Sequence, residues 1–359
     1  MAKKYKEHYD CTKLINSLDA NGEKPTFFCA CSFDRGPGKS YQFSKLLIDR
    51  FMEKGDRFIL LCRNRGDLGN VAAGVLNSYV AQAHPEWHIS ETIQMKSTFS
   101  NIYLTRGSGD EEEKLHVGWV VSLKSQDRIK LISSTFYSAW AFFFDEFMPT
   151  DKSSFLPNEL DCLRTIYKSV ARGESHATRY MPVFMSSNTL SIQNPYFMAW
   201  GITNKIQSNT KFYRGVGVIF ELVEVEGLRE EHAASGFDRA IQKHLARTES
   251  SNIWINDNNS LVVPKSKTEG WGRGRYVCTL IYNNDKFGVV TYDSVGITYI
   301  SRVIDKSSEY VFNLTLEGEL NIPLLKITPY LETLKKRLFG GLIRCSDGGV
   351  QAMLCDVFA

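Results

Sequence analysis

Two short motifs, well separated along the chain, constrain its fold more than any other feature. The first, Cys31–Ser40, has the sequence Cys-Ser-Phe-Asp-Arg-Gly-Pro-Gly-Lys-Ser and lies between an aromatic-rich run and a helical pattern. The second, Ala141–Glu146, is an apolar run that ends in two adjacent carboxylates. Together they predict a P-loop enzyme that hydrolyses a nucleotide.

The first motif has the chemistry of a phosphate cradle. Gly36 and Gly38 let the backbone turn sharply and direct N–H groups and the next helix N-terminus toward phosphate oxygens. Lys39 is expected at the β- and γ-phosphates, and the hydroxyl of Ser40 at Mg²⁺. Phe33 stands where the G-x-x-x-x-G-K-[ST] pattern has its first glycine, so the motif is deviant. Glycine turns before helices are common, and the alternative is an ordinary turn.

The second motif describes a buried strand whose acidic end lies where open α/β sheets bind ligands. Asp145 is expected to organise Mg²⁺, and Glu146 to orient and activate the attacking water. The alternative is an ordinary strand that ends in a solvated acidic turn. The presence of both motifs in one chain favours the nucleotide site.

Length and composition describe an ordinary globular protein. A single hydrophobic core seldom exceeds roughly 250–300 residues, and this chain of 359 residues is therefore expected to form one large and one smaller domain. Its 43% hydrophobic and 23% charged residues argue against disorder. The formal net charge of +3 permits local basic faces but does not by itself indicate a polyanionic partner.

Cysteine usage and the N-terminus predict a protein of the cytoplasm. The eight cysteines include no Cys-x-x-Cys pair, so we expect buried, reduced thiols and neither a zinc site nor a disulfide framework. Met1–His8 lacks an apolar targeting core, and no run approaches the roughly 20 apolar residues that span a bilayer. We therefore expect no secretion and no membrane-spanning segment.

Strands and helices alternate in the first part of the chain, which predicts a parallel sheet covered by helices. The predicted strands are Thr26–Ser32, Arg57–Cys62, His116–Leu123, Ala141–Phe144 and Met181–Met185, and the predicted helices are Lys39–Met52, Asp67–His84 and Pro157–Ala171. We expect one strand between the two strands that carry the motifs. That order, with a glutamate in the second motif, favours ring-forming, translocating ATPases of the ASCE type over kinases and GTPases.

A charged helical pattern and a polar stretch separate this part from the rest of the chain. We place a P-loop ATPase domain at residues 1–226, a helical linker region at 227–260 and a small domain at 261–359. The last domain is predicted to be α+β and RNase-H-like. Its expected elements are strands at Tyr276–Tyr282, Gly288–Tyr292 and Thr298–Ser301 and a helix at Pro329–Leu338.

Several separated motifs resemble those of the DNA-packaging (encapsidation) ATPases of small podophages with protein-primed genomes, the Picovirinae type, which are relatives of terminase large subunits. These motifs are Arg35–Tyr41, Phe143–Phe147, Leu156–Glu159, Ser187–Asn188 and Asn194–Phe197, with weaker similarity at Ile281–Asn283 and Gly288–Val289. The resemblance spans most of the chain. Its Asn-Pro-Tyr-Phe and Asp-Glu-Phe elements are specific to this group, whereas the Gly-Lys-Ser turn is shared with many NTPases.

The resemblance implies a motor that hydrolyses ATP, with Mg²⁺, to drive double-stranded viral DNA into an empty prohead. Such enzymes form a homo-oligomeric ring, a pentamer, docked on the portal. The implied partners are therefore DNA, the portal protein and further copies of the chain, with a structural RNA as an additional candidate and no membrane. The implied location is the host cytoplasm, transiently at the portal vertex, and the protein is expected to be absent from the mature virion.

The family's functional residues are carried over by motif. Lys39 and Ser40 match the Walker A lysine and serine, and Asp145 and Glu146 match Walker B. Asn188 matches the motif that senses the γ-phosphate and couples hydrolysis to movement. The implied nucleotide-binding residues are Arg35, Gly36, Pro37, Gly38, Lys39, Ser40 and Tyr41.

Arg172 matches the helix position of the family's trans-acting arginine finger. An arginine from a neighbouring subunit would stabilise charge that develops on the γ-phosphoryl group, an effect worth roughly 10³–10⁵ in rate. The alternative is a solvated arginine that complements a helix C-terminus. Arg179 is the runner-up, because this sequence carries extra residues between Arg172 and Ser187.

RNase-H-like nucleases use clustered aspartates to hold two metals about 3.5–4 Å apart. The small domain lacks the carboxylate that is expected in its first strand. Cys278–Tyr282 contains no acidic residue, and Asp293 is a single aspartate at the end of the next strand. Whether Asp347 and Asp356 lie close to Asp293 is not determined by the sequence. We therefore expect a vestigial nuclease domain without cleavage activity. The alternatives are a nuclease-competent terminase and a non-catalytic portal-binding or nucleic-acid-binding subunit with a decayed P-loop.

Three basic residues, Lys124, Arg128 and Lys130, fall in a polar segment that we predict to be a loop between strands. A translocating ring is expected to contact DNA mainly at phosphates and without regard to sequence. These residues are therefore candidates for DNA contacts in the pore. The alternative is an ordinary solvated loop.

Overall fold

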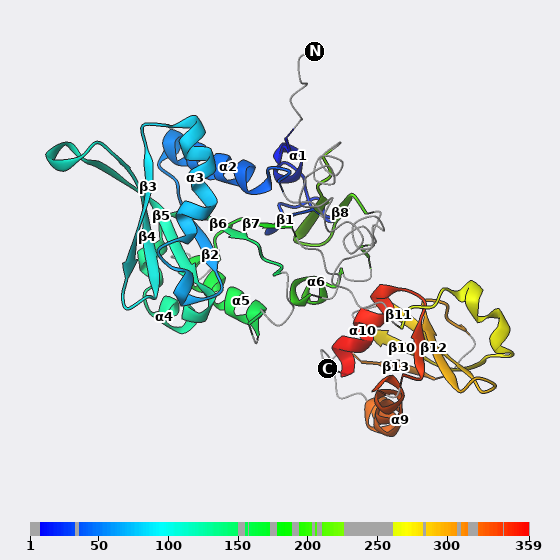
Figure 1. Ribbon diagram of the computed structural model, residues 1–359. Coiled ribbons are helices and arrows are strands. Elements are labelled where there is room, and N and C mark those ends of the chain that lie inside the picture. The colour runs from blue at the N-terminus through cyan, green and yellow to red at the C-terminus, as the bar shows by residue number, and fades with distance from the viewer. Residues whose placement is uncertain are drawn as a thin grey trace, which may run out of the picture. The chain divides into compact units, whose positions relative to one another are not determined.

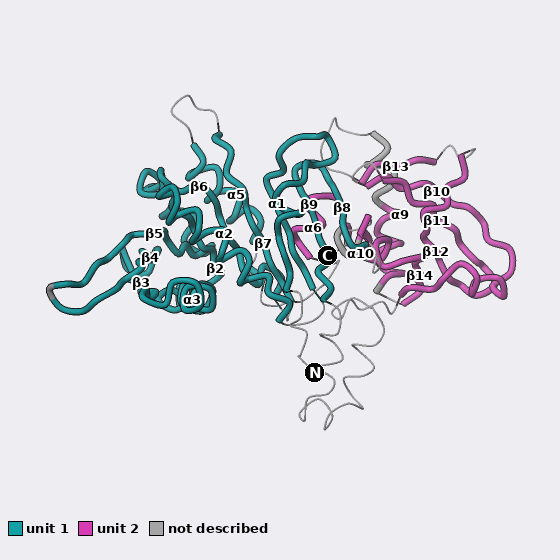
Figure 2. Tube along the Cα trace, turned by 90° about the horizontal axis from the view of Figure 1, so that it is seen from above, with its two compact units in different colours: residues 1–191, 208–256 teal, residues 192–207, 257–359 magenta. Residues whose placement is uncertain are grey.

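The computed structural model divides the chain into two compact units, residues 1–191 with 208–256 and residues 192–207 with 257–359 (Figure 2). The structure describes residues 8–32, 36–149, 155–156, 158–172, 178–188, 194–202, 205–206, 210–225, 261–282, 285–306, 310–314, 322–339 and 341–358. The predicted linker helix, Phe33, Arg35 and Pro157 lie outside these residues.

The first unit is built on a nine-stranded mixed sheet with the spatial order β3-β4-β5-β2-β6-β7-β1-β9-β8 (Figure 1). The strands are β1 Phe27–Cys31, β2 Arg57–Cys62, β3 His88–Gln94, β4 Phe99–Arg106, β5 Glu113–Ser122, β6 Ala139–Asp145, β7 Val183–Ser187, β8 Phe212–Arg214 and β9 Val218–Leu222. The six strands from β5 to β9 in this order are parallel, and antiparallel pairing is confined to β3–β4–β5 and β8–β9.

The central strands confirm the order predicted from the sequence. β7 pairs with both β1 and β6, so one strand separates the strands that carry the two motifs. All five predicted strands of this unit are present, with ends shifted by a few residues. The outer strands β3 and β4 at one side of the sheet, and β9 and β8 at the other, were not predicted. β3 has no fully buried residue and therefore lacks the apolar pattern that marks a strand.

Helices cover both faces of this sheet because its central strands are apolar on both faces. Successive residues of β6 point to opposite sides. On one side Phe143 packs against Phe43 of α2 (Lys39–Lys54), with ring centroids 5.1 Å apart. On the other side Phe142 packs against Tyr167 of α5 (Glu159–Val170), at 5.8 Å. Helix α3 (Val71–Ala83) lies beside α2, and α4 (Gln126–Leu131) lies beside α5.

The segment with three basic residues is helical, so the loop predicted there was wrong. It consists of the 3₁₀ turn Leu123–Ser125 followed by α4. Leu123, Ser125 and Ile129 are buried, whereas Lys124, Arg128 and Lys130 are exposed. Two apolar anchors among polar residues are too weak a pattern to predict a helix of six residues.

The second unit contains a five-stranded sheet with the order β13-β10-β11-β12-β14. The strands are β10 Arg275–Tyr282, β11 Asp285–Tyr292, β12 Ile297–Ser301, β13 Val311–Asn313 and β14 Ile343–Cys345, and the helices are α6 Pro195–Ala199, α9 Ile322–Phe339 and α10 Gly348–Phe358. β10, β11 and β12 form the predicted antiparallel meander, and β13 pairs parallel with β10. The helix predicted to start at Pro329 begins earlier, and this proline lies inside it.

Two further expectations concern cysteines and membranes. The seven cysteines whose side chains are described are all free and buried, which agrees with the prediction of reduced thiols. Burial raises the pKa of the Cys31 thiol at the end of β1, so this group stays neutral beside the P-loop. Within the described residues, no helix has both the length and the apolar character that crossing a bilayer demands.

Candidate nucleotide site

The P-loop connects β1 to α2 at the carboxyl edge of the first sheet. Gly36 and Gly38 have φ angles of 82° and 98°, a region that residues with a side chain rarely adopt. Gly38 is also the N-cap of α2, a helix of 16 residues. The turn therefore directs a helix N-terminus and its unpaired N–H groups into the space above the sheet, where they suit an anion.

Lys39, Asn188 and Glu146 form one chain of hydrogen bonds. The ammonium group of Lys39, which is 3% exposed, donates to the hydroxyl of Ser32 and to Oδ1 of Asn188, the latter at 2.7 Å. Nδ2 of Asn188 in turn donates to Oε1 of Glu146 at 2.6 Å. Asn188 directly follows β7, the strand between β1 and β6. The strand order thus brings together three residues that are far apart in the sequence.

Asp145 is the last residue of β6, and its Oδ1 atom carries two contacts. It accepts hydrogen bonds from the hydroxyl of Ser186 and, at 3.1 Å, from the backbone N–H of Glu146. Glu146 itself has a φ of 51°, in the left-handed region, so the chain turns sharply between the two carboxylates. Such a conformation costs about 1–3 kcal/mol and persists only where the surroundings enforce it.

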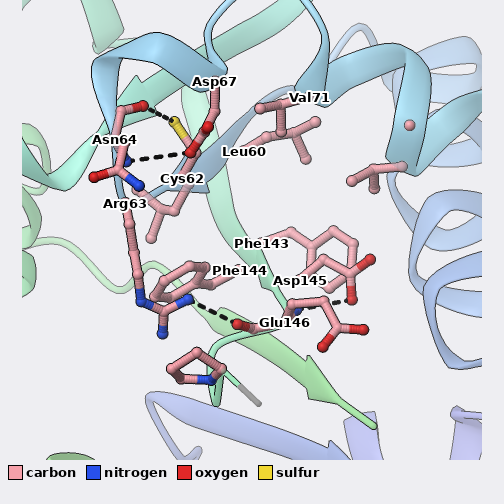
Figure 3. A pocket seen from close by; sticks show the side chains of 14 residues that line it. Leu60, Cys62, Arg63, Asn64, Asp67, Val71, Phe143, Phe144, Asp145 and Glu146 are labelled. Atoms are coloured by element: carbon pink, nitrogen blue, oxygen red, sulfur yellow. Dashed lines mark hydrogen bonds between the residues drawn. The ribbon is translucent and has the colours of Figure 1, made fainter. Parts of the chain in front are cut away.

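Arg63 supplies that enforcement, and its role was not predicted from the sequence. Its guanidinium group donates to the backbone carbonyl of Glu146 at 2.9 Å (Figure 3). It also donates to the backbone carbonyl of Phe147. The same group forms a two-pronged ion pair with Glu159, with Nε–Oε2 and Nη2–Oε1 distances of 2.9 and 3.0 Å. The side chain of Glu159 is fully buried, and it also accepts the N–H of Leu156 at 2.9 Å.

The Arg63–Glu159 pair explains why the turn after β6 is held in place. Arg63 follows β2, the neighbour of β6, while Glu159 begins α5. The guanidinium group also lies over the ring of Phe144, 4.9 Å from its centroid. The negative charge of Glu159 is electrostatically favourable at a helix N-terminus. The sequence contained one usable signal, an arginine directly after a buried apolar strand, where its charge requires a partner.

Two cavities lie around this network. One, of about 470 Å³, is lined by Lys39, Ser40 and Asn188 together with the neighbouring P-loop residues Gly36, Pro37, Gly38, Tyr41 and Gln42, and by His8, Ser78 and Gln82. The other, of about 440 Å³, lies over the ends of β2 and β6 and includes Arg63, Asp67, Asp145 and Glu146 (Figure 3). Both volumes fall in the range of small-molecule sites.

The predicted Mg²⁺ ligands have suitable chemistry. Ser40 offers a hydroxyl in the first turn of α2, and Asp145 offers a carboxylate at the end of β6. Mg²⁺ prefers oxygen ligands and is commonly bound by one or two carboxylates together with substrate phosphates and waters. Among the described residues there is no cluster of three or more His, Cys, Asp or Glu side chains that could hold a metal without a substrate.

The two candidates for a trans-acting arginine differ in their surroundings. Arg172 is exposed just after α5, where its backbone bridges to Thr178. Arg179 is half-buried, donates to the carbonyl of Val170 at 3.4 Å, and lies 5.8 Å from the ring centroid of Tyr137. Burial lowers the pKa of Arg179. Arg179 is thus engaged within its own unit, whereas Arg172 is open to solvent.

The candidate DNA-contact residues lie outside both cavities. Lys124, Arg128 and Lys130 are exposed on the segment that follows β5, and Arg128 donates to the hydroxyl of Thr98 at 3.3 Å. The backbone N–H of Lys124 donates to the carbonyl of Arg63 at 3.3 Å. This basic segment is therefore attached directly to the arginine that holds the turn of Glu146.

Two of the aspartates considered for a nuclease site form ion pairs with arginines. Asp347 accepts the N–H of Val350 at 3.1 Å at the start of α10 and pairs with Arg302 at 3.3 Å. Asp293, just after β11, pairs with Arg275 at 3.6 Å. The side chain of Asp356 lies outside the described residues.

Comparisons with known proteins agree with this architecture. The family model described as podovirus DNA encapsidation protein (Gp16) matches residues 27–339. The chain belongs to this family. The DNA packaging proteins of Bacillus phages phi29 and PZA are each 24% identical to it over 331 residues, which cover 90% of this chain and 91% of each relative.

The similarity extends to the fold of both units. A chain of the bacteriophage phi29 viral genome packaging motor assembly superposes with a TM-score of 0.59 at 21% identity, covering 98% of each chain. At this level of identity the match concerns the fold alone. It supports a P-loop ATPase fold followed by a small α+β domain across the whole chain.

The buried ion pair leads to a prediction about stability. Replacing Arg63 by Ala leaves the charge of Glu159 buried without a partner, which is expected to lower the free energy of unfolding by about 3–5 kcal/mol. The matched control is Arg106→Ala, because Arg106 pairs with Glu113 on the surface, with both side chains more than two-fifths exposed, and should lose less than about 1 kcal/mol. Urea denaturation of each variant measures the difference.

A second variant separates charge burial from lost packing. The double variant Arg63→Met with Glu159→Gln removes both charges and keeps an acceptor for the N–H of Leu156, so it should recover a large part of the loss. Equal losses in Arg63→Ala and Arg106→Ala would contradict a structural role for the buried pair.

Proposed function

We propose that the chain is the ATP-hydrolysing subunit of a homo-oligomeric ring, a pentamer, that drives double-stranded viral DNA through a portal into a preformed prohead. The observation that carries the proposal is the hydrogen-bonded chain from Lys39 through Asn188 to Glu146, located above the parallel sheet of a member of the DNA encapsidation family. A lysine at the phosphates and a side chain that orients the attacking water recur in enzymes that hydrolyse nucleoside triphosphates.

Each residue of the chain has a proposed task. Lys39 and the N–H groups of the P-loop bind the β- and γ-phosphates, and Ser40 and Asp145 hold Mg²⁺, which when bound neutralises the phosphate oxygens. Glu146 orients the attacking water. Asn188 contacts both Lys39 and Glu146, so it is placed to report the state of the phosphates to the catalytic carboxylate.

Arg172 is proposed as the residue that a neighbouring subunit supplies to the γ-phosphate. Its exposure supports this choice over Arg179, whose guanidinium group is occupied by Val170 and Tyr137. A finger in trans requires a neighbouring subunit, and in the proposed ring the next subunit completes the site of each one. The proposed location is the portal vertex during packaging, in the host cytoplasm and not in the mature virion, and a structural RNA is a further candidate partner.

ATP hydrolysis tests the motor directly. Steady-state turnover of the wild type should rise on addition of double-stranded DNA, and Glu146→Gln and Arg172→Ala should each lose this turnover by roughly 10³-fold or more, because each removes a group that acts on the transition state. Mixing the two inactive proteins should restore part of the activity, since each supplies the group that the other lacks. Arg179→Ala is the matched control and should remain active.

One outcome would remove the proposal. If the wild type hydrolyses no ATP alone, with DNA, or with DNA and proheads, the chain is a binding subunit with a decayed P-loop. If Arg172→Ala hydrolyses ATP at the wild-type rate, only the assignment of Arg172 as the trans-acting arginine fails.

DNA contact through the basic segment gives a second test. Simultaneous Lys124→Ala and Lys130→Ala changes should weaken DNA binding and make it less salt-dependent, because each lost phosphate contact reduces the slope of log K against log salt by about 0.9. Fluorescence anisotropy with a labelled duplex at several salt concentrations measures this slope, and Lys54→Ala, another exposed lysine, is the control. If the slope of log K against log salt is unchanged, Lys124 and Lys130 do not contact DNA phosphates.

Nuclease activity separates the motor from the terminase alternative. The proposed vestigial domain should leave supercoiled plasmid intact with Mg²⁺ or Mn²⁺, because Cys278–Tyr282 supplies no carboxylate to join the late aspartates in holding two metals. An agarose gel of plasmid incubated with the pure protein is the measurement. Robust metal-dependent cleavage that is lost in Asp293→Ala would identify a nuclease-competent enzyme instead.

A further inference from the structure

The N-terminal segment His8–Cys11 precedes the first strand of the sheet, yet it lies against the P-loop. The backbone N–H of Tyr9 donates to the carbonyl of Pro37 at 2.9 Å. A Cβ atom placed on Gly38 would be 3.7 Å from the Cβ of His8 and 3.9 Å from the backbone nitrogen of Tyr9. The segment therefore lies beside the turn that leads into α2.

The side chain of Tyr9 is held by β9. Its ring is buried, and its hydroxyl donates to Oε2 of Glu221 at 2.8 Å. The side chain of Glu221 is 14% exposed, and Nζ of Lys13 lies 3.9 Å from its Oε1 atom. Glu221 belongs to β9, which pairs parallel with β1, the strand that leads into the P-loop. Tyr9 therefore links the P-loop to the strand beside β1.

The contact with Tyr9 sets the direction of a backbone donor in the P-loop. The carbonyl of Pro37 and the N–H of Gly38 belong to one peptide unit, and the described residues contain no cis peptide bond. A trans peptide is planar, so its C=O and N–H groups point in opposite directions. Because the carbonyl of Pro37 is directed at Tyr9, the N–H of Gly38 points away from the N-terminal segment. This N–H is one of the groups that a P-loop offers to phosphate oxygens.

The composition of the turn makes this orientation important. Proline has no backbone N–H, so Pro37 leaves the loop with one donor fewer for an anion. Gly36 and Gly38, on either side of it, have φ angles of 82° and 98°. Glycine loses more conformational freedom on folding than any other residue. A turn of this kind needs a contact that holds it in one conformation, and the N–H of Tyr9 provides one.

We propose that Tyr9 is a positioning residue of the nucleotide site, which is anchored on Glu221 and holds the Pro37–Gly38 peptide in the orientation that binds phosphate. The proposal rests on the proposed function, because it places the phosphates of the nucleotide at the P-loop. It extends the site to two residues outside both sequence motifs, which are 212 positions apart in the chain.

Isothermal titration calorimetry with ADP and with pyrophosphate, each in the presence of Mg²⁺, tests the proposal without requiring turnover. Tyr9→Phe removes the hydroxyl and keeps the buried ring, so the segment loses its anchor on β9 but not its packing. We expect the affinities for both ligands to fall by the same factor, roughly three- to tenfold, because a misaligned N–H loses part of a charge-assisted hydrogen bond to phosphate. An equal factor indicates an effect at the phosphates, since pyrophosphate has neither sugar nor base.

Variants of Glu221 separate positioning from a general loss of stability. Glu221→Gln keeps an oxygen that accepts the hydroxyl of Tyr9, so it should bind both ligands within about twofold of the wild type. Glu221→Leu removes the acceptor and should weaken binding as Tyr9→Phe does. The double variant Tyr9→Phe with Glu221→Leu should lose no more affinity than either single variant, because both changes remove the same bond. Glu221→Leu also carries the test if Tyr9→Phe fails to fold.

The matched control is Tyr180→Phe. The hydroxyl of Tyr180 donates to the carbonyl of Pro25 at 2.9 Å, so it also ties the chain that precedes β1, but neither residue lines the cavity above the P-loop. Its loss should leave both affinities unchanged. Thermal unfolding followed by circular dichroism checks that each variant is folded at the temperature of the titration.

Four outcomes would overturn the proposal. If Tyr9→Phe and Glu221→Leu bind both ligands as the wild type does, Tyr9 does not position the P-loop, and the proposed function stands because ADP is still bound. A loss for ADP alone would place the effect at the sugar or the base. An equal loss in Tyr180→Phe would assign the effect to stability. If the wild type binds neither ligand, the proposed function and this inference both fail.

Discussion

The parallel pairing of β6, β7 and β1 is the constraint on which the rest of the site depends. Parallel neighbours end at the same edge of a sheet, so the residues that follow them are brought together whatever their distance in the sequence. Lys39 enters from the loop after β1, Asn188 follows β7, and Glu146 follows β6. The two hydrogen bonds that join these residues need this order of strands, because Asn188 reaches both partners only from the strand between them.

A second constraint comes from the buried charge of Glu159. Glu146 occupies the left-handed region at a cost that a solvated loop would not sustain. Its backbone is held by Arg63, and Arg63 is in turn held by Glu159, whose buried carboxylate would be costly without this partner. A buried ion pair adds little net stability compared with an apolar pair, so its main effect here is to position the turn of Glu146. It fixes the direction in which the chain that carries the carboxylate of Glu146 leaves the sheet.

The sequence predicted the parts of this structure that depend on local chemistry. Glycines before a lysine and carboxylates after an apolar strand are each common, but their occurrence together in one chain is typical of a P-loop enzyme, so Gly38, Lys39 and Asp145 could be placed at the sheet edge from the two motifs. The Arg63–Glu159 pair could not, because it joins residues that are 96 positions apart, and the position of Arg63 after an apolar strand indicates that it needs a partner but not which one. Such a pair can be predicted only when the strand order is known, because the order places Arg63 beside the turn that leads to Glu159. The strand β3 and the helix α4 were missed for a related reason, since β3 has no fully buried residue and α4 is anchored chiefly by Ile129. Periodicity reports burial, and elements that bury little give little signal.

The arrangement of the two cavities gives Glu146 an unusual position. Its side chain lines the cavity over β2 and β6, yet its hydrogen-bond partner Asn188 lines the cavity above the P-loop. The hydrogen bond between Asn188 and Glu146 therefore connects the two cavities, whose other lining residues differ. The basic segment that begins at Lys124 reaches the first of these spaces through the backbone of Arg63. One backbone hydrogen bond therefore links this segment to the arginine that holds the turn of Glu146, and the two cavities are connected through the same turn.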